Sequence, residues 1–320
     1  MKHRMLLLVR WGVFLAAAAF LWAKLAGGQG THAAWGALHA ALASAPAWFW
    51  PLMLAMAGLN WGLEAIKWKR LVAEVEVMSL GRALTATLAG TAVALVTPNR
   101  TGEVAGRVLF LAPDRRWRGG VATVLGAMAQ FTATLLLGAI AFLWWHAASG
   151  LPAAVPPGWG PGPVVAALLL ACASLGLYLR PGLVHRGVAR LPLLRRLAGP
   201  AEVLHRFRTP DLMAVLGLSI ARYAVFWLQY VVFLVVLAGM AWQGALVAVP
   251  VIYLVSTLVP TMLLSELGVR GSVAVALLLP LGGAPALVLL ASFGVWALNL
   301  ALPAAAGAVV MVTSRMRNRR

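Results

Sequence analysis

Two segments of the chain place a carboxylate and a guanidinium four residues apart within otherwise apolar sequence. In "TPNRTGEVAGR" these residues are Glu103 and Arg107, and in "PTMLLSELGVRGS" they are Glu266 and Arg270. Side chains at this spacing share one face of a helix and can form an ion pair. Such a pair offers a cation to a phosphate and a carboxylate to a proton or a cationic head group. A purely structural ion pair that steadies the segment remains an equally open interpretation.

A second polar group lies within the second apolar run and just after it. In "NWGLEAIKW" (60–68), Asn60, Glu64 and Lys67 fall on one helical face at spacings of four and three. Lys67 is also placed to act as an ordinary anchor at the membrane interface. Arg222 lies deep in the apolar run 211–239, where an ionised group costs roughly 2.5–3.5 kcal/mol. Each of these charges is therefore expected to have a partner.

The elements that position these residues are membrane helices. Of the 320 residues, 62% are hydrophobic and 11% are charged, and the mean hydropathy is +0.90. Soluble domains carry roughly 25% charged residues. Several apolar runs approach the roughly 20 residues that a helix needs to cross a bilayer. We interpret the first run, 5–25, as a retained span rather than a cleaved signal.

The basic residues indicate the topology. The formal charge is +18, but Lys and Arg are absent from long apolar stretches and crowd into short segments, namely the N-terminus, 67–82, 115–118, 180–208 and 315–320. This alternation is the positive-inside pattern. It places both termini in the cytoplasm, favours anionic lipid as the counter-charge and argues against a nucleic-acid partner. The single cysteine excludes an intrachain disulfide, and the scattered histidines predict no metal site and no cofactor.

The resulting prediction is an all-α polytopic membrane protein, with a single membrane domain over 1–320. It has six full spans, at about 5–25, 48–66, 119–145, 164–180, 211–239 and 286–312. Two re-entrant helical hairpins, 83–118 and 246–281, complete it, because both ends of each lie on one side. Proline cannot continue a helix and glycine permits unusual backbone angles. The predicted breakers are Pro98, Gly102, Pro260 and Gly268, with Arg100 at the first tip.

The two hairpins belong to a predicted inverted repeat with halves 1–160 and 161–320. A shift of 162 carries Asn60 onto Arg222 and Trp61 onto Tyr223, and it carries Lys67 onto Gln229 and Pro98 onto Pro260. After one inserted residue, Glu103 and Arg107 fall on Glu266 and Arg270. The shift is about half the chain, and inverted repeats are common in secondary transporters. It makes Tyr223 and Gln229 further candidates. Glycines four apart, Gly58–Gly62 and Gly102–Gly106, also permit close helix contacts.

These motifs, with "RYAVFWLQY" (222–230), resemble the lysylphosphatidylglycerol synthase transmembrane-region family of flippase-like membrane proteins. The resemblance covers most of the chain. It implies a multi-pass protein of the bacterial inner membrane, related to the lipid-translocating part of larger aminoacyl-phosphatidylglycerol proteins. Those relatives carry an additional cytosolic synthase domain. Because this chain ends at Arg320 soon after its last span, we expect that domain to be absent.

The leading functional hypothesis is a flippase-like transporter of a polar or anionic lipid head group, with membrane phospholipids as partners. It works by alternating access at the paired Glu/Arg hairpins. We expect no enzymatic activity and no catalytic residue, since no nucleophile–base pair or metal set is present. Two alternatives stay open. One is a membrane-embedded enzyme acting on a lipid phosphate, and the other is a non-catalytic accessory protein of the cell envelope.

The topology is testable by cysteine labelling. In a background without Cys172, single cysteines introduced in the Pro/Gly-rich loop 149–163 should react with an impermeant maleimide added to intact cells. Cysteines in 195–208 should react only after the membrane is permeabilised, because positively charged segments stay in the cytoplasm. The opposite labelling pattern would rule out the predicted orientation.

Overall fold

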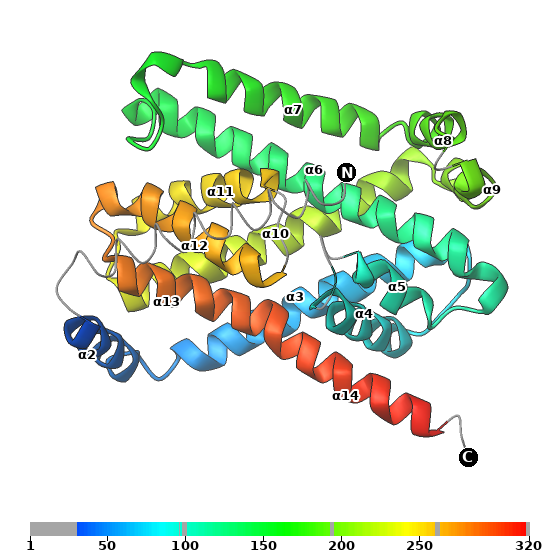
Figure 1. Ribbon diagram of the computed structural model, residues 1–320, viewed down its shortest axis with the longest axis horizontal. Coiled ribbons are helices and arrows are strands. Elements are labelled where there is room, and N and C mark those ends of the chain that lie inside the picture. Colours follow the sequence, from blue (N-terminus) through cyan, green and yellow to red (C-terminus); the bar gives the residue numbers. More distant parts are fainter. Residues whose placement is uncertain (1–30, 96, 98–100, 193–194, 260–262, 318–320) are drawn as a thin grey trace, which may run out of the picture. The chain divides into compact units, whose positions relative to one another are not determined.

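The chain folds into helices joined by turns. The computed structural model describes residues 31–95, 97, 101–192, 195–259 and 263–317, and within these ranges no β-strand occurs. The prediction of an all-α protein is therefore confirmed for the described residues (Figure 1). The predicted first span, 5–25, lies outside them, as do Pro98, Arg100 and Pro260.

The helices follow the predicted segments closely. Short 3₁₀ turns lie at Pro113–Arg115, Pro157–Trp159, Arg195–Leu197, Glu202–Arg206 (η5) and Leu279–Leu281, and a π turn, η7, lies at Ala297–Ala301. The α-helices are α2 (Thr31–Ala43), α3 (Phe49–Val72), α4 (Leu80–Leu95), α5 (Gly102–Val108), α6 (Arg116–Ser149), α7 (Gly162–Tyr178), α8 (Pro181–Arg190), α9 (Ala198–Ala201), α10 (Thr209–Ala238), α11 (Trp242–Leu258), α12 (Leu263–Leu278), α13 (Pro285–Trp296) and α14 (Leu302–Arg317).

Prolines and glycines set several of the helix ends. Pro181 and Pro285 are the first residues of α8 and α13, where the missing amide proton has no helical partner to lose. Between α6 and α7 the chain turns at Gly150 and Gly160, whose φ angles are 76° and 50°. Glycine adopts this left-handed conformation without steric cost. The predicted Pro/Gly-rich loop is therefore present between these two helices.

The chain divides into two compact units. Of the described residues, the first unit takes 31–56, 137–167 and 226–298. It contains α2, α11, α12 and α13, with parts of α3, α6, α7 and α10. Gly294 of α13 lies against the Phe233 ring, and Phe49 packs edge-on against the same ring with centroids 5.1 Å apart. Aromatic contacts of this kind hold the helices of this unit together.

The second unit takes residues 57–136, 168–225 and, among the described ones, 299–317. It contains α4, α5, α8, α9 and α14, with the remaining parts of α3, α6, α7 and α10. Its main core cluster is formed around Leu71, Leu125, Tyr178, Phe207 and Leu212. The charged residues Glu64, Lys67, Glu103, Arg107 and Arg222 all belong to this unit.

Three described helical segments are long and apolar enough to cross a membrane, namely Pro113–Ser149, Thr209–Ala238 and Pro285–Val312. The pair α7 and α8, bent by 86°, makes a fourth if it is counted as one span. The protein is thus an integral membrane protein with several apolar helices. At 24 residues α3 is long enough, but it carries Asn60, Glu64 and Lys67 among its apolar residues. The total of six spans stays a prediction.

Each predicted hairpin consists of two helices with a break between them. In the first, α4 ends at Leu95 and α5 begins at Gly102, and in the second, α11 ends at Leu258 and α12 begins at Leu263. The Gly102 amide donates to the Thr97 hydroxyl at 2.8 Å, which fixes the start of α5. Gly268 was predicted to break the second hairpin, and this is wrong. It lies inside α12, which continues through it because a single glycine only weakens a helix.

Glycines bring the backbones of the second unit close together. A Cβ atom on Gly106 would lie 2.7 Å from the Gly90 Cα atom, so α4 and α5 touch along a glycine surface. A Cβ on Gly307 would overlap the Leu88 carbonyl, so α14 lies equally close to α4. At Gly58 and Gly62, where the sequence also permits a close contact, a Cβ would meet no described atom within 4 Å.

This packing generates a stability prediction. Gly307→Ala should lower the free energy of unfolding by about 1–3 kcal/mol, because the methyl group forces α14 away from the α4 backbone. Gly58→Ala is the matched control, since it adds the same group to open space and should leave stability unchanged or raise it by about 0.5–1 kcal/mol. Thermal unfolding in detergent measures both, and equal stability of the two variants would contradict the close approach of α14 and α4.

Candidate functional site

One buried carboxylate lies at the centre of the candidate site. Glu64 on α3 contacts Lys67 Nζ at 2.7 Å, Arg107 Nη1 at 2.8 Å and Arg222 Nη1 at 3.1 Å. Its side chain is 7% exposed, and those of Lys67 and Arg107 are 2% and 3% exposed. The three cations come from three different helices, α3, α5 and α10. The carboxylate therefore ties these helices together.

A second carboxylate reaches the same cluster from α5. Glu103 forms an ion pair with Arg107 Nη2, four residues later on the same helix, as the spacing predicts. Its side chain is 24% exposed and is thus the least buried charged group among those that contact Arg107. Three cationic and two anionic side chains leave the cluster with one positive charge. An anion is therefore the ligand that its electrostatics favour.

Side-chain amides complete the network. Asn60 donates to the Asn299 oxygen at 2.8 Å and accepts from Arg222 Nε at 2.9 Å. The Gln130 oxygen accepts from Arg222 Nη1 at 3.2 Å and lies 3.5 Å from Lys67 Nζ. Neutral amides satisfy these donors without adding charge, as buried polar groups require.

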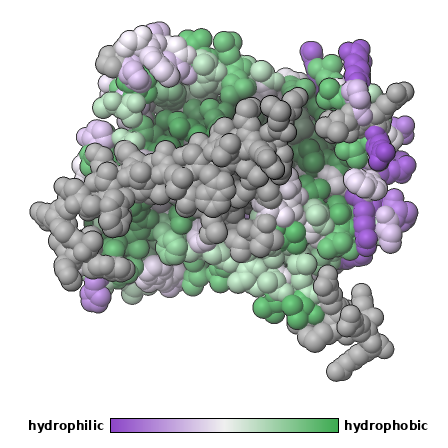
Figure 2. Space-filling view, in the orientation of Figure 1, coloured by the Kyte–Doolittle hydropathy of each residue, from purple (hydrophilic) through white to green (hydrophobic). Residues whose placement is uncertain are grey.

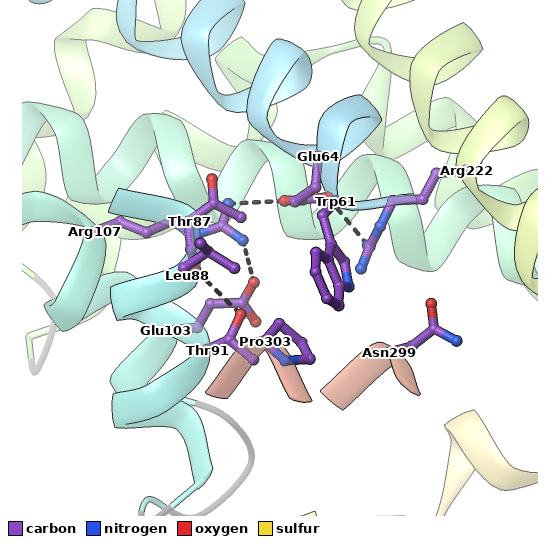
Figure 3. A pocket seen from close by; sticks show the side chains of 10 residues that line it. All are labelled: Trp61, Glu64, Thr87, Leu88, Thr91, Glu103, Arg107, Arg222, Asn299 and Pro303. Carbon is purple, nitrogen blue, oxygen red and sulfur yellow. Dashed lines mark hydrogen bonds and ion pairs between the residues drawn. The ribbon is translucent and has the colours of Figure 1, made fainter. Parts of the chain in front are cut away.

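These side chains surround a cavity (Figure 3). The cavity is lined by Trp61, Glu64, Thr87, Leu88, Thr91, Glu103, Arg107, Arg222, Asn299 and Pro303. The Trp61 ring points into it, and its buried Nε1 has no hydrogen-bond partner among the described residues. The space left at the centre has room for about one water molecule. A larger ligand must therefore displace one of the existing ion pairs.

The structure brings six of the predicted residues into this cluster. They are Asn60, Glu64, Lys67, Glu103, Arg107 and Arg222. Gln130, Asn299 and Trp61 were missed by sequence reasoning. A polar side chain inside a long apolar run was the available signal for Gln130 and Asn299. Trp61 offers no such signal, because tryptophan is common in membrane helices.

The other predicted residues lie elsewhere. Tyr223 is buried on α10 and is not among the residues that line the cavity. In the first unit, buried Gln229 donates to the Met53 carbonyl at 2.9 Å. Also there, the Arg270 guanidinium carbon lies 5.2 Å from the centre of the Tyr253 ring, a cation–π contact. Glu266 lies in α12, and its side chain is outside what the structure describes.

The described residues contain no group of three or more His, Cys, Asp or Glu side chains placed to hold a metal ion. The site consists instead of guanidinium, ammonium, carboxylate and amide groups. Groups of this kind bind phosphate and carboxylate oxygens through charge-assisted hydrogen bonds.

These features define an α-helical integral membrane protein with a buried, charged cavity inside one of its units. The family comparison gives the particular assignment. Residues 9–307, nearly the whole chain, match the model of the lysylphosphatidylglycerol synthase TM region, and the chain belongs to this family. The family groups membrane proteins associated with lipid handling. None of the curated proteins matches the chain.

The central role of Glu64 is testable by a double-mutant cycle. Glu64→Gln should destabilise the protein by about 3–5 kcal/mol, because it leaves buried cations without their carboxylate. Adding Lys67→Met should recover part of the loss, since one of those cations is removed as well. Unfolding in denaturant measures both steps. Glu74→Gln, on an exposed carboxylate, should change stability by no more than about 0.5 kcal/mol. If the stability changes of Glu64→Gln and Lys67→Met simply add in the double variant, the contact between Glu64 and Lys67 is contradicted.

Proposed function

We propose that the protein is a flippase-like transporter of a polar, anionic lipid head group and that it has no enzymatic activity. The observation that carries the proposal is the cluster around Glu64, which places three cations and two carboxylates in a cavity within apolar helices. Such groups are costly in a membrane protein and usually mark a substrate or ion pathway. Membership of a family associated with lipid handling supports a lipid as the class of substrate.

Binding would proceed by exchange of ion-pair partners. The cavity is too small for a head group while Arg107 is paired with Glu103. Glu103 is the more exposed carboxylate, so it is the partner that a lipid phosphate would displace. Arg107 would then hold the phosphate through its Nη2, and Glu64 would keep its contacts with Lys67 and Arg222. The Trp61 Nε1 donor offers the ligand a further hydrogen bond.

Transport would use the two hairpins as the halves of an inverted repeat. The helix bounds support a repeat of this length. A shift of 162 residues carries α4 onto 242–257, within one residue of α11, and carries α3 onto 211–234, inside α10. In an inverted repeat the hairpins would approach the membrane centre from opposite sides and open in turn. The head group would move through the protein while its acyl chains stay in lipid.

The setting of this activity is also part of the proposal. We place the protein in the bacterial inner membrane with both termini in the cytoplasm, in agreement with its segregated basic residues. Membrane phospholipids are the partners, and nucleic acid is not. The energy would come from an ion, a proton or the lipid gradient, since the sequence carries no nucleotide-binding motif.

The exchange mechanism predicts a split between binding and transport. In Glu103→Gln, Arg107 loses the carboxylate that competes with the ligand. An anionic lipid should then bind at least as tightly as in the native protein. The transport rate should nevertheless fall by about tenfold or more, because the site no longer closes on its own ion pair after the lipid has left. Liposomes with a fluorescent lipid whose head group is bleached from outside measure the rate, and equilibrium lipid binding in detergent measures the affinity.

The matched control is Glu74→Gln, which removes an exposed carboxylate and should keep the native rate. A folded Glu103→Gln protein with native transport would refute the site assignment, whereas a native protein that moves no lipid would favour a non-catalytic accessory protein. Conversion of the lipid into a new product would favour the membrane-embedded enzyme. Loss of binding together with transport would contradict the exchange of partners.

A further inference from the structure

A basic segment follows α7 and is not part of the cavity. Residues 180–208 contain seven arginines and a single acidic residue, Glu202. The segment forms α8, α9 and η5. In Figure 2 the residues over α7 are mostly hydrophobic, and hydrophilic residues gather beside α8 and α9. The composition therefore changes sharply at the end of α7.

The direction of α8 follows from the bend between these helices. α7 exposes apolar side chains along its length, from Val165 to Leu177, and its 17 residues span about 25 Å at 1.5 Å per residue. These are the properties of a helix in the hydrocarbon layer. α8 is bent away from it by 86°, and in Figure 1 α7 is seen from the side while α8 is seen nearly end-on. A helix perpendicular to α7 runs parallel to the membrane surface.

Packing fixes the orientation of α8. Val184 and Val188 pack against the core cluster that includes Phe207 and Leu212. The ring of His185 lies against that of His205 in η5, with Nδ1 and Nε2 3.1 Å apart. At the end of α7, the Tyr178 hydroxyl donates to the Leu212 carbonyl at 2.7 Å. The face of α8 opposite Val184 and Val188 is therefore turned outward.

The outward face combines apolar and cationic side chains. Leu183 is 44% exposed and Leu191 is 53% exposed, and between them Arg186 and Arg190 are exposed as well. Leucine beside arginine is the combination that suits the boundary between acyl chains and head groups, where the apolar part enters the membrane and the guanidinium reaches the phosphates.

From this geometry we infer that α8 is an interfacial helix that binds the anionic head groups of the membrane in which the protein sits. The contact surface is formed by Leu183, Arg186 and Arg190 of α8 and by Leu191, the residue that follows the helix. Leu183 and Leu191 insert at the level of the glycerol backbone, and the two arginines pair with lipid phosphates. This surface is separate from the proposed transport site, so it stands or falls independently of that proposal.

The experiment uses the full chain in vesicles. Leu183→Cys in a Cys172→Ala background carries an environment-sensitive fluorophore. In phosphatidylcholine vesicles that also contain phosphatidylglycerol, the emission should shift to the blue, and added salt should reverse part of the shift. Arg186→Gln with Arg190→Gln should weaken the preference for phosphatidylglycerol by roughly 25-fold, at about fivefold for each arginine near an anionic surface.

The matched control is Lys69→Gln with Arg70→Gln, which removes two exposed cations from α3 and should leave the response unchanged. Four outcomes would overturn the inference. The label could report a watery environment in both kinds of vesicle, or inorganic phosphate added to vesicles of phosphatidylcholine alone could give the same blue shift. The preference for phosphatidylglycerol could also fall equally in both double variants, or in neither of them. Native thermal unfolding of the double variants establishes that α8 remains folded.

Discussion

The second unit depends on one buried carboxylate that faces three cations. Without Glu64, the charges of Lys67, Arg107 and Arg222 would lie together among apolar helices. Removing an ion from water costs several kcal/mol even after the protein relaxes. The carboxylate offsets this cost for all three cations at once, and it does so between α3, α5 and α10. The positions of these helices and the electrostatics of the cavity are therefore consequences of the same contact.

The position of Arg107 depends in turn on glycine. α5 has only seven residues, and a helix of this length is not stable by itself in water. It is held against α4, where Gly106 meets Gly90. A Cβ atom on Gly90 would lie 2.7 Å from the Arg107 Cγ atom, so the arginine side chain passes directly over this glycine on its way to Glu64. Backbone packing and ion pairing are thus coupled, and neither could change without the other.

Much of the charged cluster around Glu64 was predictable from the sequence, because charged residues are rare in apolar segments. The spacing of Glu103 and Arg107 predicted their pair, and the depth of Arg222 predicted a partner. Asn299 was missed because a neutral amide in a span demands no opposite charge, and because it lies in the π turn Ala297–Ala301, which has no marker in the sequence. At Gly58 and Gly62 no close contact occurs among the described residues. Paired small residues permit a close helix contact, but they do not determine whether another helix lies there.

The predicted repeat also implies that its two hairpins differ in chemistry. Under a shift of 162, Glu64 falls on Phe226 and Lys67 on Gln229, so α10 supplies no carboxylate at the position where α3 supplies one to Arg107. Arg270, the counterpart of Arg107, lies over the Tyr253 ring. An aromatic face stabilises a cation without cancelling its charge, whereas Glu64 cancels part of the charge of Arg107. The predicted repeat therefore pairs the carboxylate of Glu64 on α3 with an aromatic residue, Phe226, on α10.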